Sequence, residues 1–198
     1  MESWKVLWRY VAGVVACAVI GYYPYAQQRR VPLLGGVDLG FHELGHMLTY
    51  MFPDVITAIM GSVFQVAIPL GLAAYFGLRR RDFLAAGLCL AWAGASAADV
   101  SVYIADGPFQ RLPLIGGSHD WAFLLGPAAF DNLDGAAAIA GAVKILGGLL
   151  VLAGIALCFR GPFVHHHEVR PLNHRALRVR EPRRWVEPET LPTGSPSD

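Results

Sequence analysis

The sequence predicts an all-α, polytopic membrane protein, a helical bundle of about five transmembrane helices with a disordered C-terminal tail. Composition is the first observation, because 55% of the 198 residues are hydrophobic and the mean hydropathy is +0.43. The second is that apolar residues form runs close to the ~20 residues that a helix needs to cross a bilayer. The third is that arginines stand between these runs. We therefore expect a membrane domain over residues 1–160 and a polar tail over residues 161–198.

Five apolar segments carry this prediction, and each ends at charged residues or at a proline or glycine turn. They run from about Leu7 to Ala26, Pro32 to Phe52, Val55 to Leu78, Phe83 to Ala105 and Ala136 to Phe159. Lys5 and Arg9 precede the apolar run from Val11 to Ala26, but no small-residue cleavage site follows that run. We therefore expect a retained helix and not a signal peptide.

The charges of the chain bear on its partners and its orientation. A net charge of +1 excludes the strongly basic composition of a nucleic-acid-binding protein, so membrane lipid is the expected surroundings. With five spans, Arg29-Arg30, Arg79–Arg81 and the tail from Arg160 fall on one side, which the positive-inside rule makes cytoplasmic. The N-terminus would then lie outside despite Lys5 and Arg9. This arginine bias and the small size suit a bacterial inner membrane.

Cysteine usage points away from both disulfides and metal binding through thiols. Cys17, Cys89 and Cys158 lie inside apolar segments, are odd in number and form no C-x-x-C pair. We expect them to pack as small apolar side chains.

The second apolar segment contains H-E-x-x-H, the zinc-hydrolase signature. On a helix, His42 and His46 lie one turn apart on the same face and can bind one Zn²⁺, and Glu43 lies beside them as a candidate general base. Ionisable groups in a membrane helix are costly and are therefore functional-site candidates. At ~1.5 Å per residue, His42 is expected roughly 14 Å from the cytoplasmic end of its segment.

Two further polar residues are candidates for supporting this site. Asp38 stands one turn before His42 and could orient an imidazole. Gln65, in the third apolar segment, needs a partner. That partner is either the site or a neighbouring helix, through an ordinary inter-helix hydrogen bond.

A catalytic zinc usually has three protein ligands, so a third ligand must come from elsewhere in the chain. Asp134 stands at the start of the last apolar segment, where its other role would be a helix N-cap. His119 and Asp120 form a His-Asp pair after two glycines and are the alternative. Asp99, inside the fourth segment, is a third choice.

These motifs resemble the site-2 protease family of intramembrane zinc proteases, the M50 class. That family combines His-Glu-x-Gly-His in one membrane helix with Leu-Asp-Gly at the start of a later one, as in residues 42–46 and 133–135 here. The resemblance covers roughly residues 35–150 and implies Asp134 as the third zinc ligand. The asparagine that precedes Leu-Asp-Gly in the family is missing, and the resemblance suggests Asn132 for its substrate-holding role. No PDZ-like insertion is present, so the chain would be a minimal, divergent member.

The expected function is therefore an intramembrane zinc metalloprotease that hydrolyses a peptide bond in or near a transmembrane segment of another protein. Zinc would activate a water molecule and polarise the scissile carbonyl, while Glu43 would accept and return the proton. The motif permits two other interpretations. One is a membrane zinc hydrolase of a lipid or small amphiphile, and the other is a scaffold or metal-binding protein without catalysis.

Overall fold

The structure is a computed structural model that describes residues 2–114 and 118–168, with side chains described for residues 7–114 and 118–160. Every regular element in these residues is helical, which confirms the all-α prediction. The elements are α1 (Glu2–Tyr25), α2 (Leu34–Thr49), α3 (Asp54–Ala74), the π-helical turn η1 (Tyr75–Arg80), α4 (Phe83–Asp106), α5 (Asp120–Leu125), the 3₁₀ turn η2 (Leu133–Gly135) and α6 (Ala136–Glu168).

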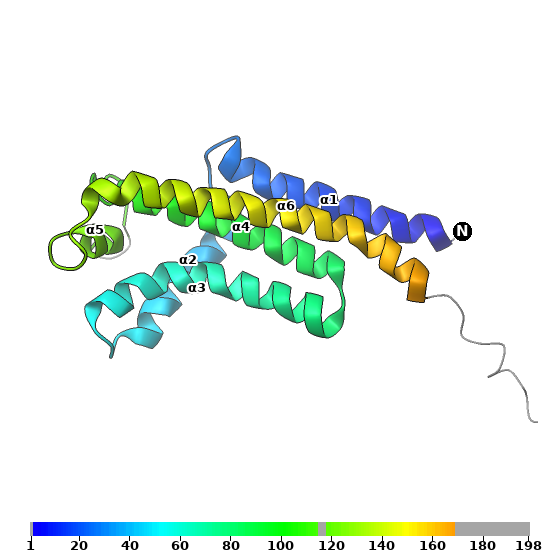
Figure 1. Cartoon of the computed structure of the whole chain (residues 1–198), viewed down its shortest axis with the longest axis horizontal. Coiled ribbons are helices and arrows are strands. Elements are labelled where there is room, and N and C mark those ends of the chain that lie inside the picture. The colour runs from blue at the N-terminus through cyan, green and yellow to red at the C-terminus, as the bar shows by residue number, and fades with distance from the viewer. Residues whose placement is uncertain (1, 115–117, 169–198) are drawn as a thin grey trace, which may run out of the picture.

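The antiparallel pair α4 and α6 forms the centre of the molecule (Figure 1). Helix α1 packs against both of these helices, α3 lies along α4, and α2 packs mainly against α3. Glycines allow the closest approach, because a Cβ on Gly94 would collide with the carbonyl oxygen of Gly147 on the facing helix. Small residues are the usual means by which membrane helices pack at short distance.

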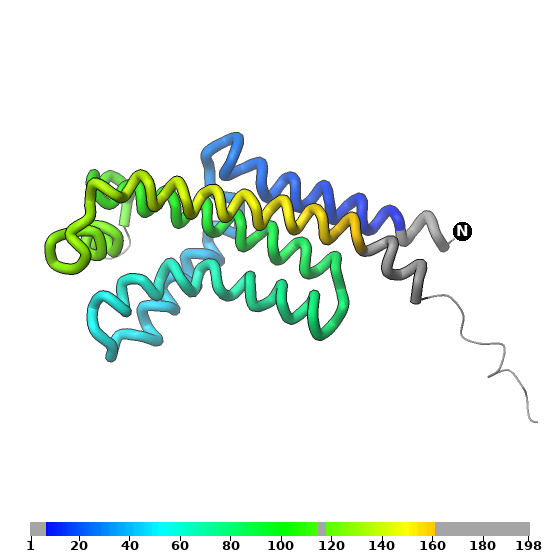
Figure 2. The backbone as a smooth tube through the Cα atoms, viewed as in Figure 1, coloured from blue at the N-terminus to red at the C-terminus, as the bar shows by residue number. Residues whose placement is uncertain are grey.

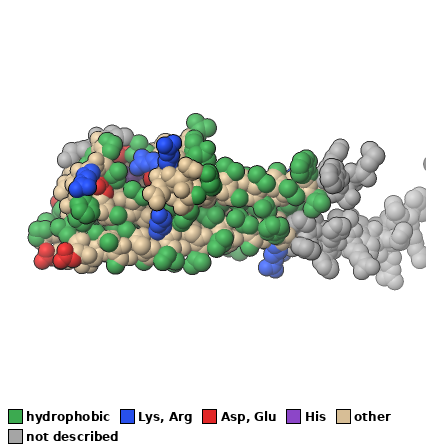
Figure 3. Space-filling view, turned by 90° about the horizontal axis from the view of Figure 1, so that it is seen from above, with side chains coloured by type: hydrophobic (Ala, Val, Ile, Leu, Met, Phe, Trp, Pro, Cys, Tyr) green, Lys and Arg blue, Asp and Glu red, His purple; other side chains and the backbone are tan. Residues whose placement is uncertain are grey.

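Within the part of the chain that the structure describes, three helices are long and apolar enough to cross a membrane. They are Asp54–Arg80, Phe83–Asp106 and Leu133–Arg160, out of the five spans that the sequence predicts. Helix α2, with 16 residues, is shorter than the ~20 that a span requires. Helix α1 has 24 residues, but its tyrosines and charged residues lower its hydropathy. Figure 3 shows the charged side chains gathered mainly toward the end that carries α5, over an otherwise largely hydrophobic face.

Helix α1 ends about halfway along α4 and α6, as the tube in Figure 2 shows. The Tyr25 hydroxyl there donates a hydrogen bond to the carbonyl oxygen of Lys144 (2.9 Å). Arg30, just beyond, forms an ion pair with Asp99 (2.8 Å). Asp99 follows Phe83 by sixteen residues, so Arg30 lies about 24 Å along α4 from its first residue. Arg29-Arg30 and Arg79–Arg81 therefore lie at different levels along α4, whereas the sequence analysis expected them on one side of the membrane.

Helix α6 continues past Phe159, where the apolar segment ends, to Glu168. The difference has a simple reason, since an apolar pattern marks the part of a helix that avoids water and not the point where its hydrogen bonding stops. The first residues of the expected disordered tail, 161–168, are thus helical, including the His165–His167 backbone. The rest of the tail, 169–198, lies outside the described residues.

Candidate metal centre

Helix α2 presents the two motif histidines toward α3. Its buried face consists of Asp38, His42, Gly45 and Thr49, at the spacing of successive helical turns. Gly45 brings the two helices together, because a Cβ there would collide with the carbonyl oxygen of Met60. Gly61 leaves room for the rings, because a Cβ there would lie 2.5 Å from Nε2 of His46 and 2.8 Å from Nε2 of His42.

Three potential ligand atoms converge beside Gly61. Nε2 of His42 lies 3.0 Å from Nε2 of His46 and 3.0 Å from Oδ2 of Asp120, and Nε2 of His46 lies 3.2 Å from the same oxygen. Ligands about 2.0–2.1 Å from a tetrahedral zinc are about 3.3 Å apart, so the three atoms have nearly the spacing that such an ion requires. Among the described residues, His42, His46 and Asp120 form a group that could hold a metal ion.

The hydrogen bond on the far side of His46 indicates what this group is built to hold. Nδ1 of His46 donates to the carbonyl oxygen of Thr57 (2.9 Å), since a carbonyl can only accept. In the neutral ring, Nε2 of His46 then carries no proton, and its lone pair faces the carboxylate of Asp120. Two acceptors at 3.2 Å repel one another unless a cation or a proton lies between them, and Nε2 of His42, 3.0 Å from each, can carry that proton. Two imidazole nitrogens and one carboxylate oxygen are also a donor set that suits a divalent metal such as zinc.

Asp120 is positioned by the short helix α5, which begins with it. His119, only 3% exposed, caps α5 by accepting at Nδ1 from the backbone N–H of Ala122 (3.2 Å), and its Nε2 donates to Asp106 on α4 (3.3 Å). The indole N–H of Trp121 donates to Ser62 on α3 (3.0 Å). His119 thus binds the start of α5 to α4, and Trp121 binds it to α3. Asp120, which stands between these two residues in the sequence, contacts His42 and His46.

Tyr103 on α4 is a site residue that the sequence analysis missed. Its hydroxyl donates to Oδ2 of Asp120 (3.2 Å) and accepts from the backbone N–H of Asp120 (3.1 Å). Its ring stacks on His119, with centroids 4.3 Å apart, and contacts His42 edge-on. A tyrosine near the end of an apolar helix carries no motif, so only the folded chain reveals this role.

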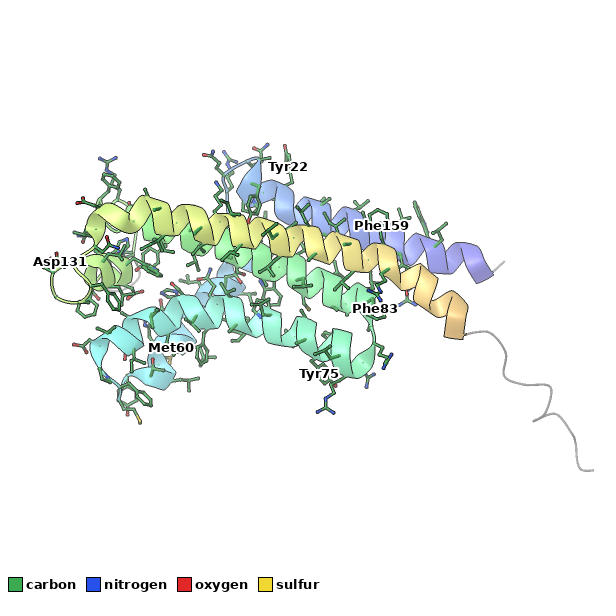
Figure 4. All side chains as sticks on the ribbon, in the orientation of Figure 1. Tyr22, Met60, Tyr75, Phe83, Asp131 and Phe159 are labelled. Carbon is green, nitrogen blue, oxygen red and sulfur yellow. The ribbon has the colours of Figure 1, made fainter. Side chains whose placement is uncertain are left out.

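The three ligand residues line a cavity of about 740 Å³. Glu43, the predicted general base, also lines this cavity and lies on the exposed side of α2. Gln65 lines the same cavity, but its amide donates to Asp99 on α4 (3.2 Å), so it makes an inter-helix hydrogen bond within the site region. The stick view in Figure 4 shows side chains filling the space between α5 and the α2–α3 pair.

Asp38 does not orient an imidazole as predicted. It is 4% exposed, and its Oδ1 accepts from the indole N–H of Trp92 (2.8 Å) and from the hydroxyl of Ser96 (2.9 Å). Asp38 shares a helix face with His42, but that face also meets α4, and α4 supplies the partners. The residue instead holds α2 against α4.

The structure does not bring Asp134 to the histidines. Asp134 lies exposed in η2, ahead of α6, and is not among the residues that line the metal cavity. Asn132, also exposed, stands before the same turn and likewise does not line the cavity. Of the ligands weighed from the sequence, Asp120 is the one that joins His42 and His46, while His119 supports it and Asp99 pairs with Arg30.

Comparisons of this chain with protein-family models, with curated proteins and with solved structures find no match. The likeness to site-2 proteases therefore depends on the motif residues alone, and the chemistry of the site depends on its own geometry.

Proposed function

We propose that the protein is a membrane-embedded zinc hydrolase in which His42, His46 and Asp120 hold the metal and Glu43 is the general base. The observation that carries this proposal is the convergence of two imidazole nitrogens and one carboxylate oxygen within 3.0–3.2 Å. The ligands come from α2 and α5, which lie far apart in the sequence and are held together by α3 and α4.

Different residues of the chain would have different roles in the reaction. Zinc bound here would supply Lewis-acid polarisation of a substrate carbonyl and would lower the pKa of a water molecule. Glu43 would take the proton from that water and deliver it to the leaving group. The Thr57 carbonyl fixes the tautomer of His46, and Tyr103 holds Asp120 from two sides.

A peptide bond in or near a transmembrane segment of another protein is the substrate class that the motif resemblance favours. A membrane helix hides its carbonyls in hydrogen bonds, so the substrate would have to unwind before its carbonyl could enter the cavity. The mixture of polar and apolar lining residues, among them Leu39, Ala58 and Val100, is compatible with such a segment.

Hydrolysis of a lipid or another small amphiphile is the second candidate. The cavity volume of about 740 Å³ is the observation that favours it, since small-molecule sites typically occupy about 300–1,000 Å³. The catalytic residues would have the same roles, and only the scissile bond would differ.

The charge distribution supports a revised topology in which α1, α3, α4 and α6 cross the membrane and α2 does not. Lys5, Arg9, Arg79–Arg81 and Arg160 then share the cytoplasmic side, and the discord at the N-terminus disappears. Thr57 and Gly61, which contact the histidines, are the fourth and eighth residues of α3, so the site lies about 5–10 Å from the opposite end of that helix. The metal would be near the non-cytoplasmic surface and not roughly 14 Å from the cytoplasmic one.

Zinc analysis of the detergent-purified protein tests the metal site. Wild type should contain about one zinc per chain, and His42→Ala and Asp120→Ala should lose it. Asp134→Ala is the matched control because it removes an exposed aspartate outside the cavity, and it should keep the metal. Each protein should lack residues 165–167, so that the histidine tract does not bind zinc. Well-folded wild type without zinc, or zinc lost only in Asp134→Ala, would overturn the assignment.

Turnover by Glu43→Gln tests the hydrolytic role. The variant should retain zinc and lose hydrolysis by at least about a hundredfold, as expected when a general base is removed. The substrates are a panel of membrane-spanning peptides and a panel of phospholipid esters. Cleavage of one panel identifies the substrate class, whereas cleavage of neither by zinc-loaded wild type favours the non-catalytic scaffold.

A further inference from the structure

A second cavity, of about 470 Å³, lies on the other side of the Arg30–Asp99 ion pair. It is formed by the end of α1, the segment that leads to α2, and the facing parts of α4 and α6. Arg30, Asp99, Leu112 and Pro113 line both this cavity and the metal cavity, so the two are neighbours. His42, His46 and Asp120 do not line the second cavity.

The charges around this cavity do not balance. Three basic residues line it, Arg29, Arg30 and Lys144, together with the two aspartates Asp38 and Asp99. Asp38 is already satisfied by Trp92 and Ser96 on α4, and Asp99 is paired with Arg30. The side chains of Arg29 and Lys144 have no hydrogen-bond or ion-pair partner within residues 7–114 and 118–160. The side chains that line the cavity therefore carry one excess positive charge, and neither Arg29 nor Lys144 forms an ion pair among the described residues.

Of these two residues, Lys144 has the stronger need for a counter-charge. It is the only charged residue between Asp134 and Arg160, in a helix otherwise apolar enough to cross a membrane. A charged side chain within such a helix is costly and normally pairs with an opposite charge. Since no acidic side chain of the described residues forms an ion pair with Lys144, the counter-charge is expected to come from a ligand.

The level of the cavity in the bilayer indicates the kind of ligand. Sixteen residues separate Lys144 from Arg160, and sixteen separate Arg9 from Tyr25, so each helix rises about 24 Å over that interval. That distance approaches the ~30 Å of a hydrocarbon core. Tyr22, Tyr23 and Tyr25 end α1 at this level, as aromatic residues do at a membrane interface, and Figure 4 places Tyr22 between Asp131 and Phe159 along the long axis.

We propose that this cavity binds the phosphate of an anionic phospholipid, with Arg29 and Lys144 as its counter-charges. Exposed apolar side chains beside the cavity, Val102 (51%) on α4 and Ile145 (67%) on α6, are available for the acyl chains. Basic pockets between membrane helices are suited to anionic headgroups. The ligand would be a lipid of the leaflet opposite to Arg79–Arg81, and this inference rests on the proposed four-span topology and not on the zinc chemistry.

Native mass spectrometry of the delipidated full-length protein, titrated with dioleoylphosphatidylglycerol, tests the proposal. Wild type should bind one lipid more tightly than the others. An Arg29→Gln, Lys144→Gln variant should bind that lipid about 30-fold more weakly, because each basic residue near a headgroup contributes about fivefold. Arg79→Gln, Arg80→Gln is the matched control, since it removes two exposed arginines that line neither cavity, and its first binding event should be unchanged.

Three results would overturn the assignment. An equal loss of lipid affinity in the control variant would mean that binding depends only on the total charge of the protein. Equal affinity for dioleoylphosphatidylcholine would mean that the negative charge is not recognised. Displacement of the lipid by inorganic phosphate would make the ligand a soluble anion. Lys144→Arg retains the charge and should retain binding, which separates recognition from misfolding.

Discussion

At the scale of single residues, glycines determine how close the histidines can lie to α3. Gly61 is the clearest case, because the imidazoles occupy the space where any other side chain would begin. The absence of a side chain at position 61 is therefore as important to the candidate metal centre as the ligands are. No ligand motif identifies it, since a glycine in a membrane helix usually indicates only close packing.

Gly61→Ala should abolish zinc binding while leaving the helices folded. The added methyl group would lie 2.5 Å from Nε2 of His46 and would push the ring away from Asp120. Gly71→Ala on the same helix is the control, since nothing lies within 4 Å of its new Cβ. Zinc content and far-UV circular dichroism measure the two effects. Full zinc occupancy in Gly61→Ala would mean that the rings are not against α3.

Tyr103→Phe should weaken zinc binding about 10- to 100-fold, the usual effect of removing a hydrogen bond to a metal ligand. The ring would still stack on His119, but Asp120 would lose both contacts with the hydroxyl. Competition with a zinc chelator measures the change. Tyr75→Phe, on an exposed tyrosine of η1, should have wild-type affinity. An equal affinity in Tyr103→Phe would remove this residue from the site.

At the scale of elements, the sequence predicts what periodicity and motif spacing can determine. The apolar runs locate α1, α3, α4 and α6, and the H-E-x-x-H spacing places His42 and His46 together on α2. The third ligand could not be chosen in this way, because it depends on how α5 docks. That docking is determined by His119, Trp121 and Tyr103, whose partners lie on other helices. Asp134 matches a family motif but begins a helix elsewhere.

The packing of α4 on α6 gives a prediction at this scale. Gly94→Ala should lower the unfolding temperature in detergent, because its Cβ would meet the Gly147 carbonyl and force the helices apart. Overpacking of this kind typically costs about 1–3 kcal/mol. Gly141→Ala on α6 has open space and should have little effect. Equal melting temperatures for Gly94→Ala and wild type would show that this contact is looser than described.

At the scale of the whole molecule, the end of α1 determines the level at which the chain turns into α2. Because α1 stops beside Lys144, the chain turns into α2 at mid-bundle, and α2 lies with the site at one end. The sequence alone treats five apolar segments as five equal spans. The sequence pattern does not show that α2 has only 16 residues, or that α2 begins partway along α4 and α6 and not at an end of the bundle.

Cysteine labelling tests the proposed orientation. In a variant with Cys17, Cys89 and Cys158 replaced by alanine, Gln110→Cys should react with a membrane-impermeant maleimide in intact cells. Arg80→Cys, also exposed but at the opposite end, should react only after the membrane is opened. The reverse pattern would place the metal cavity on the cytoplasmic side and contradict the four-span topology.

The position of Thr57 and Gly61, close to the first residue of α3, also bears on where the protein would acquire its metal. A zinc site near the non-cytoplasmic surface would exchange with the metal pool of that compartment and not with the tightly buffered pool of the cytosol. Occupancy would then follow zinc supply outside the cytoplasm, and loading would occur after α3 has inserted. Scarcity of zinc in that compartment would thus directly limit the fraction of the protein that holds its metal.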